Sequence, residues 1–207
     1  MKKAFTMIEL VFVIVVVGVL SYFIASSFQR NTLREAADQI VSHIRYTQHL
    51  AMIDDKFDPA QPIWFAENWQ MWIQILQGSY YYEIFSDRNR LGNSDANEEA
   101  IDPLTKNRLG NGSAAVGILP TNRDLLLTEK YGITSIVFTN NCRVGQGGKI
   151  AFDSIGRPFG NVSYDATDPY YKYLTQDCNI TLVNSDRNVT ITITQESGYA
   201  YISAQNY

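Results

Sequence analysis

Residues 2–20 read KKAFTMIELVFVIVVVGVL, and this stretch decides how the rest of the chain is interpreted. No residue from Leu10 to Phe28 is charged, so a helix over them would span roughly 28 Å, close to the thickness of a bilayer core. Two lysines precede the run, which predicts a cytoplasmic N-terminus and export of the rest of the chain. One carboxylate, Glu9, lies at the start of this apolar run. An unpaired charge at membrane depth costs on the order of 3 kcal/mol.

Two ordinary explanations of this segment are incomplete. A cleaved secretory signal peptide needs small residues at its cleavage site, and Phe23-Ile24-Ala25 places a bulky side chain there. An uncleaved membrane anchor accounts for the apolar run but gives Glu9 no role. The carboxylate is therefore the feature that separates the alternatives.

The stretch KKAFTMIEL resembles the class III leader of type IV pilins and type II secretion pseudopilins. The resemblance implies that prepilin peptidase cleaves between Ala4 and Phe5, so that residues 1–4 are a leader and Phe5 becomes an N-methylated terminus. Glu9 is then the fifth mature residue, where the family carries its assembly glutamate. Ala4 departs from the glycine that is usual in the family. Pairing Glu9 with a Phe5 amine offsets the cost of burying either charge alone.

Beyond Phe28 the apolar residues recur at three- and four-residue steps, which indicates an amphipathic helix. We expect one continuous helix from about Phe5 to about Ile53, ended by Asp54, Asp55 and Pro59. Residues 5–28 would be its transmembrane half and residues 29–54 its amphipathic half. The apolar stripe predicted to pack on a sheet consists of Leu33, Ala36, Ala37, Ile40, Val41, Ile44 and Ala51.

Residues 55–207 predict a β-rich periplasmic domain. Branched and aromatic runs predict strands at 68–76, 79–85, 125–133, 135–140, 149–152, 180–183, 189–194 and 199–203. Gly78 separates the first two as a hairpin, and residues 185–188 and Gly198 separate the last three. A long helix followed by antiparallel strands is an α+β fold, and the resemblance implies the type IV pilin-like packing of the helix on the sheet.

Three further stretches narrow the resemblance to H-type pseudopilins and related FimT-like minor pilins. These are ADQIVSHIRYTQHLAM (37–52), KIAFDSIGRPFG (149–160) and NVTITITQESGYAYIS (188–203). They imply a minor subunit of a periplasmic type II secretion pseudopilus, crossing the inner membrane once. The implied partners are other pseudopilins or pilins, prepilin peptidase and the inner-membrane assembly platform. The alternative is a FimT-like minor type IV pilin involved in DNA uptake or pilus biogenesis.

Charge and composition argue against nucleic-acid binding, a metal site on the helix and enzyme activity. The net charge of −4 disfavours nucleic-acid binding, which needs a basic face, and Gly198–Tyr201 lacks the arginines of the DNA-binding motif in FimT-like proteins. His43 and His49 are six residues apart, a spacing that does not suit a metal on one helix face, and we expect both to be solvated. The sequence shows no nucleophile with a neighbouring base, so we do not expect an enzyme.

The two cysteines, Cys142 and Cys178, are expected to form a disulfide if the domain is exported. The bond would close a loop of about 37 residues and contribute roughly 4 kcal/mol in the chain-entropy model. The alternative is a pair of unpaired buried thiols.

Residues 86–117 are polar and rich in glycine and asparagine. Asp87, Asn89, Gly92 and Glu98 fall at positions one, three, six and twelve of the EF-hand spacing, which suggests a calcium site. Leu91 stands where another oxygen ligand is needed, and the alternative is a solvated insertion. Apart from this calcium, we expect no cofactor.

Two N-x-T sequences carry an acidic residue two positions earlier, as in the bacterial N-glycosylation sequon. They place candidate acceptors at Asn179 and Asn188. The alternative is chance occurrence, because the motif is short.

Overall fold

A computed structural model describes residues 6–27, 31–111, 118–139, 142–160, 168, 171–185 and 187–206, and of residues 22–27 the backbone alone. The chain divides into two compact units, Met1–Asn31 and Thr32–Tyr207. Each unit is described by itself below.

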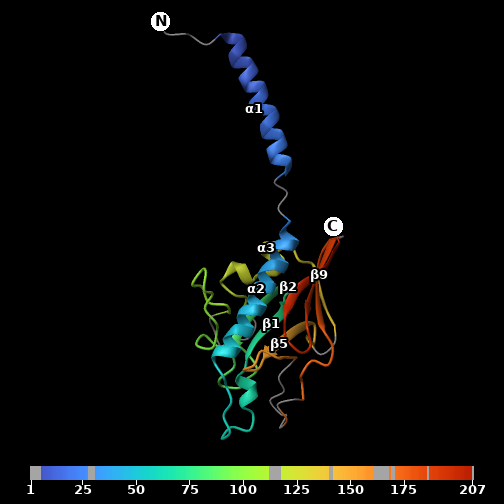
Figure 1. Ribbon diagram of the computed structural model, residues 1–207. Coiled ribbons are helices and arrows are strands. Elements are labelled where there is room, and N and C mark those ends of the chain that lie inside the picture. Colours follow the sequence, from blue (N-terminus) through green and yellow to red (C-terminus); the bar gives the residue numbers. More distant parts are fainter. Residues whose placement is uncertain are drawn as a thin grey trace. The chain divides into compact units, whose positions relative to one another are not determined.

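The first unit contains helix α1, Met7–Ser27 (Figure 1). Its side chains from Met7 to Leu20 are exposed, and nearly all of them are apolar; Phe12 is 69% and Val15 57% exposed. An amphipathic pattern is lacking because apolar residues surround the helix on every side. Within the described part of the chain, none of the helices combines the length and the apolar character that a membrane crossing requires.

The prediction of one continuous helix is wrong. Asn31 is not helical, and a second helix, α2, begins at Thr32 and ends at Ile53. Asparagine and threonine compete with the helical backbone through their own side chains and are favoured at helix starts. The periodicity of apolar residues on either side does not report such a break. The C-terminal end of α2 lies where the sequence predicts it, directly before Asp54.

The second unit is an α+β domain with antiparallel strands, as predicted, but it has two sheets instead of one. The first sheet has the order β2-β1-β5-β4, with β6 paired to β5. The second sheet has the order β3-β7-β8-β9. The strands of the first sheet are β1 (Trp69–Leu76), β2 (Ser79–Ser86), β4 (Arg143–Val144), β5 (Gly147–Phe152) and β6 (Pro158–Phe159). Those of the second are β3 (Ser135–Phe138), β7 (Cys178–Asn184), β8 (Arg187–Ile193) and β9 (Ala200–Asn206).

The predicted hairpin at the start of the domain is confirmed. β1 and β2 pair from Trp69↔Ser86 to Leu76↔Ser79. The two turn residues, Gln77 and Gly78, both have positive φ, 50° and 85°. Two such residues make the turn whose twist matches antiparallel strands.

The predicted strand at residues 125–133 is wrong. The segment forms a 3-10 helix, η2 (Arg123–Leu125), and a short α-helix, α3 (Leu127–Tyr131); another 3-10 helix, η1 (Trp64–Glu67), precedes β1. Gly132 ends α3 with φ 71°, and its N–H donates to Leu127 O and Thr128 O. The leucines at 125–127 are buried, and a short apolar run of this kind does not distinguish a strand from a buried helix.

One core joins α2 to both sheets. The helix contacts β1 and β5 of the first sheet and β7, β8 and β9 of the second (Figure 1). The stripe predicted from periodicity is buried throughout, and Ile40 and Ile44 are 0% exposed. The helix therefore holds the two sheets together through apolar contact.

Candidate functional site

Glu9 belongs to a capping box at the start of α1. The Thr6 hydroxyl donates to Glu9 Oε2 over 3.2 Å, and the Thr6 N–H points to the same oxygen at 3.4 Å. The Glu9 N–H points back to Thr6 Oγ1 at 3.4 Å. This T-x-x-E arrangement satisfies helix N–H groups that have no partner within the helix. The carboxylate thus has a local structural role that the sequence reasoning missed, although the spacing itself is the signal for it.

The cap uses one carboxylate oxygen, Oε2. Glu9 is exposed in the structure. The two residues assigned to processing, Ala4 and Phe5, lie outside the described residues, so cleavage between them stays a prediction.

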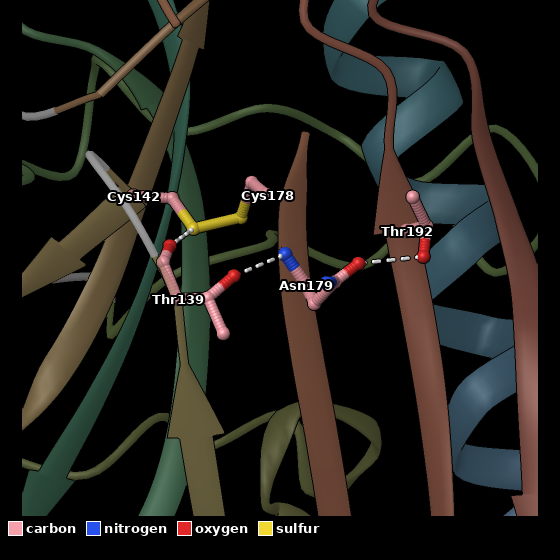
Figure 2. The surroundings of a disulfide bond; sticks show 5 residues. All are labelled: Thr139, Cys142, Cys178, Asn179 and Thr192. Atoms are coloured by element: carbon pink, nitrogen blue, oxygen red, sulfur yellow. Dashed lines mark hydrogen bonds between the residues drawn. A yellow bond between two sulfur atoms is a disulfide. The ribbon is translucent and has the colours of Figure 1, made fainter. Parts of the chain in front are cut away.

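The disulfide between Cys142 and Cys178 is confirmed (Figure 2). Cys142 directly precedes β4 of the first sheet, and Cys178 begins β7 of the second. Their Cα atoms are 6.0 Å apart, and both residues are 0% exposed. The bond is therefore a covalent link between the two sheets, shielded from solvent.

Hydrogen bonds surround this link. Thr139 follows β3, and its hydroxyl accepts from the backbone N–H of Asn179, 3.0 Å away. The carbonyl oxygen of Thr139 lies 2.8 Å from Cys142 Sγ. Thr192 of β8 donates its hydroxyl to Asn179 Oδ1 over 2.7 Å (Figure 2). The polar groups beside the disulfide are thus used to join neighbouring strands.

The predicted calcium ligands do gather in one loop after β2. Both carboxylate oxygens of Asp87 accept backbone N–H groups, from Leu91 at 3.1 Å and Gly92 at 2.7 Å. Glu98 accepts the N–H of Asn89 at 2.9 Å and that of Asp95 at 3.2 Å. The carboxylates therefore hold the loop backbone.

Burial raises the pKa of Glu98, and the charges of Asp87 and Asp95 act in the same direction. The Asn89 side chain donates to Asp95. Among the described residues, no group of three or more His, Cys, Asp or Glu side chains has the geometry to hold a metal ion. Calcium binding by Asp87, Asn89 and Glu98 stays a prediction, and the loop is ordered by its own hydrogen bonds.

The prediction that His43 is solvated is wrong, whereas His49 is exposed as expected. His43 is 9% exposed, and its Nδ1 lies 2.7 Å from the hydroxyl of Tyr82. Burial lowers the pKa of His43, against the opposing effect of Asp102 and Asp124. Gln39 donates to the same tyrosine hydroxyl over 2.6 Å. Gln39 and His43 therefore join α2 to β2 through the hydroxyl of Tyr82.

The two N-x-T sequences lie in register on adjacent strands. Asn179 pairs with Thr192, and Thr181 pairs with Thr190 across β7 and β8. The hydroxyls of Thr181 and Thr190 are 3.0 Å apart. Cross-strand hydrogen bonding accounts for the threonines and for Asn179 without a glycan. Glycosylation of Asn179 or Asn188 stays a prediction.

A buried polar cluster on the outer face of the first sheet was missed. Trp72 of β1 pairs with Glu83 of β2 on one side and with Lys149 of β5 on the other. Glu83 is 2% and Lys149 3% exposed. Burial raises the pKa of Glu83 to about 7, and nearby Glu99 adds to this. Burial lowers the pKa of Lys149 to about 8, although Asp87 and Glu83 oppose the change.

Two aromatic rings contact the ammonium group of Lys149, and an amide and a hydroxyl donate to the carboxyl group of Glu83. Lys149 Nζ lies 4.2 Å from the centroid of the Trp72 ring and 5.6 Å from that of Phe85. Glu83 Oε2 accepts from Gln74 Nε2 at 2.9 Å and from the Ser94 hydroxyl at 3.1 Å. The available signal was weak: the alternation of Trp72 and Gln74 with apolar neighbours predicts an outward face, but not the loop that covers part of it.

No family model, curated protein or solved structure matches this chain, so a proposal for its function depends on its own residues.

Proposed function

We propose that this protein is a prepilin-type structural subunit, a minor pseudopilin of a periplasmic type II secretion pseudopilus that supports protein secretion. The observation that carries the proposal is Glu9, a carboxylate in the first turn of a helix whose other described side chains are almost entirely apolar and exposed. A helix of this composition needs an apolar environment. Neighbouring helices in a filament and the lipid of the inner membrane both supply one.

In that environment the carboxylate needs a cationic partner. Cleavage between Ala4 and Phe5 would create an amine at the start of the mature chain. A Phe5 amine of a neighbouring subunit would pair with Glu9 and set the axial position of one subunit against the next. The capping box supports this role because Thr6 orients Glu9 through Oε2, and a carboxylate accepts hydrogen bonds at its other oxygen as well.

The covalent link in the second unit supports export of that unit. Disulfides form and persist in oxidising compartments such as the periplasm. In this proposal residues 55–207 lie in the periplasm, and the apolar segment 5–28 lies in the inner membrane before assembly. The proposed partners are other pseudopilins, prepilin peptidase and the inner-membrane assembly platform.

The decisive test is Glu9→Ala in the full chain, with Glu35→Ala as a matched control. Glu35 is an exposed glutamate in the first turn of α2. We expect Glu9→Ala to abolish co-assembly with the other filament subunits and secretion of the exported protein, whereas Glu35→Ala leaves both at the wild-type level. Normal assembly and secretion by Glu9→Ala would refute the proposal.

Processing is tested independently by the intact mass of the protein purified from membranes. We expect a chain that lacks residues 1–4 and carries one additional methyl group on Phe5. Replacing Ala4 with a bulky residue should leave the precursor uncut. If the mature protein retained Met1 to Ala4, Phe5 would have no free amine to pair with Glu9, and the proposed pairing would be refuted.

A further inference from the structure

A hollow lies on the first sheet, beside the end of β1 and the β4–β5 hairpin. Its volume is about 260 Å³, which is slightly below the range for drug-sized ligands, about 300 Å³ and above. No side chain in its lining carries a charge. The lining residues are Trp72, Gln74, Ile75, Val144, Gln146 and Gly147.

The first residue of β5, Gly147, has no side chain and lines the hollow next to its strand partner Val144. A Cβ at Gly147 would lie 2.1 Å from the carbonyl oxygen of Ile73, so the close approach of β5 to β1 requires glycine here. The next residue on the same face of β5 is Lys149. Its ammonium group lies over the Trp72 ring.

One wall of the hollow is a tryptophan with a cation over its ring. Trp72 pairs with Lys149 across β1 and β5, and Nζ lies 4.2 Å from the ring centroid. Lys149 is itself 3% exposed. A cation over one face of the indole favours a single orientation of the ring. The ring can therefore receive a flat ligand without first being ordered, which lowers the entropic cost of binding.

Two carboxamides border the same space. Gln74 Nε2 donates to Glu83 Oε2, and the Ser94 hydroxyl donates to that same oxygen. The bond to Glu83 anchors the amino end of the Gln74 amide, and the carbonyl oxygen at its other end is a hydrogen-bond acceptor. Gln146 lies exposed in the turn between β4 and β5. A carboxamide both donates and accepts hydrogen bonds, as do the hydroxyl groups of a sugar.

We propose that this hollow binds one unit of an uncharged polysaccharide, with the C–H face of the sugar ring against Trp72 and its hydroxyls on Gln74 and Gln146. A phosphate, a sulfate or a uronic acid would find no cation in the lining. A purely apolar ligand would make no hydrogen bond to the carbonyl oxygen of Gln74 or to the amide of Gln146. The inference does not depend on the proposed filament role.

The test is calorimetric titration of the full chain in a zwitterionic detergent, because sugar-based detergents would compete. The probes are cellotetraose, maltotetraose and chitotetraose. We expect saturable binding of at least one of them, weakened at least tenfold by Trp72→Ala, which corresponds to about 1.4 kcal/mol. Trp64→Ala is the matched control, because Trp64 packs against Phe57 and Phe65 and does not line the hollow. It should bind as the wild type does.

A second variant keeps the test informative if Trp72→Ala does not fold. Gln146 is exposed in a turn, so Gln146→Ala should fold normally and weaken binding severalfold. The proposal is overturned if none of the three tetrasaccharides gives saturable binding to the wild type. It is equally overturned if Gln146→Ala and the folded Trp72→Ala bind the active probe as the wild type does.

Discussion

The two longest helices of this chain are close in sequence and nearly equal in length, yet they are stabilised in different ways. α1 has 21 residues and α2 has 22. In α2 one stripe is buried, with Ile40 and Ile44 0% exposed, and the opposite face is polar. In α1 the described apolar side chains are exposed all round, with Phe12 at 69% and Val15 at 57%.

The difference bears on where each helix finds its apolar contacts. α2 finds its apolar partner within the chain, in the strands of both sheets. Under the proposed function, α1 finds its apolar partner in lipid or in other subunits, because hydrophobic burial is the dominant force that stabilises packed helices. A substitution in the second unit should therefore change the stability of the isolated chain. A substitution in α1 should change its behaviour in an assembly.

The largest expected effect on stability comes from the covalent link within the second unit. Replacing both cysteines, Cys142→Ser with Cys178→Ser, should lower the free energy of unfolding of this unit by about 4 kcal/mol, because the open chain regains the entropy of a 36-residue separation. Urea denaturation of the full chain, followed by near-ultraviolet circular dichroism, measures this. The helicity of α1 should not change. Unaltered stability would show that the two sheets hold together without the bond.

The second prediction compares one apolar residue from each helix. Ile40→Ala should cost about 3 kcal/mol, because it leaves a cavity between α2 and the sheets. Val15→Ala in α1 should change the unfolding of the second unit by less than about 0.5 kcal/mol. The same denaturation experiment measures both variants. Equal effects would mean that α1 contributes to the stability of the domain.

The buried stripe of α2 could be predicted because amphipathic periodicity directly reports which face meets a core. The break at Asn31 could not, since one polar residue between two helical patterns does not specify whether a helix bends, stops or continues. The segment 125–133 was misread for a related reason. Three consecutive leucines show no periodicity that would distinguish a helix from a strand. The helix there is ended by Gly132 and stabilised by burial of the leucines in the domain.

The candidate sites also differ in whether the local sequence predicts them. The disulfide followed from there being only two cysteines, together with the expectation of export. The T-x-x-E spacing of Thr6 and Glu9 is a local signal for the cap, whereas the charge of Glu9 in an apolar run points to a distant partner. The cluster of Trp72, Glu83 and Lys149 depends on strand register and on a covering loop. Neither can be read from local sequence, because the three residues lie far apart in the chain.

The third prediction is a pH dependence located in the second unit. Burial raises the pKa of Glu83 from 4.5 to about 7, so the folded state holds a proton that the unfolded state has released. The contribution of this proton to the free energy of unfolding is fully present below pH 4.5 and is lost as the pH rises through 7. The loss is on the order of 3 kcal/mol.

Glu83→Gln removes this titration, because its amide is never ionised. The fall in unfolding free energy between pH 4.5 and 8 should therefore be smaller in this variant than in the wild type. Glu196→Gln, at an exposed site, is the control and should keep the wild-type profile. Parallel profiles for Glu83→Gln and the wild type would mean that Glu83 stays ionised in the fold.

The smallest predicted effect is in α1 and concerns how Glu9 is held. Thr6→Ala removes the hydroxyl that donates to Glu9 Oε2 and faces the Glu9 N–H. Loss of such a cap costs about 1 kcal/mol, so the first-turn amides of Glu9 and Leu10 should exchange with solvent about fivefold faster. Hydrogen exchange of the full chain in detergent measures this, and Thr6→Ser should retain the protection. Because the cap is local, the unfolding of the second unit should not change. If Thr6→Ala exchanges as slowly as the wild type, the carboxylate is not held by Thr6, and the argument that its second oxygen is directed to an amine loses its support.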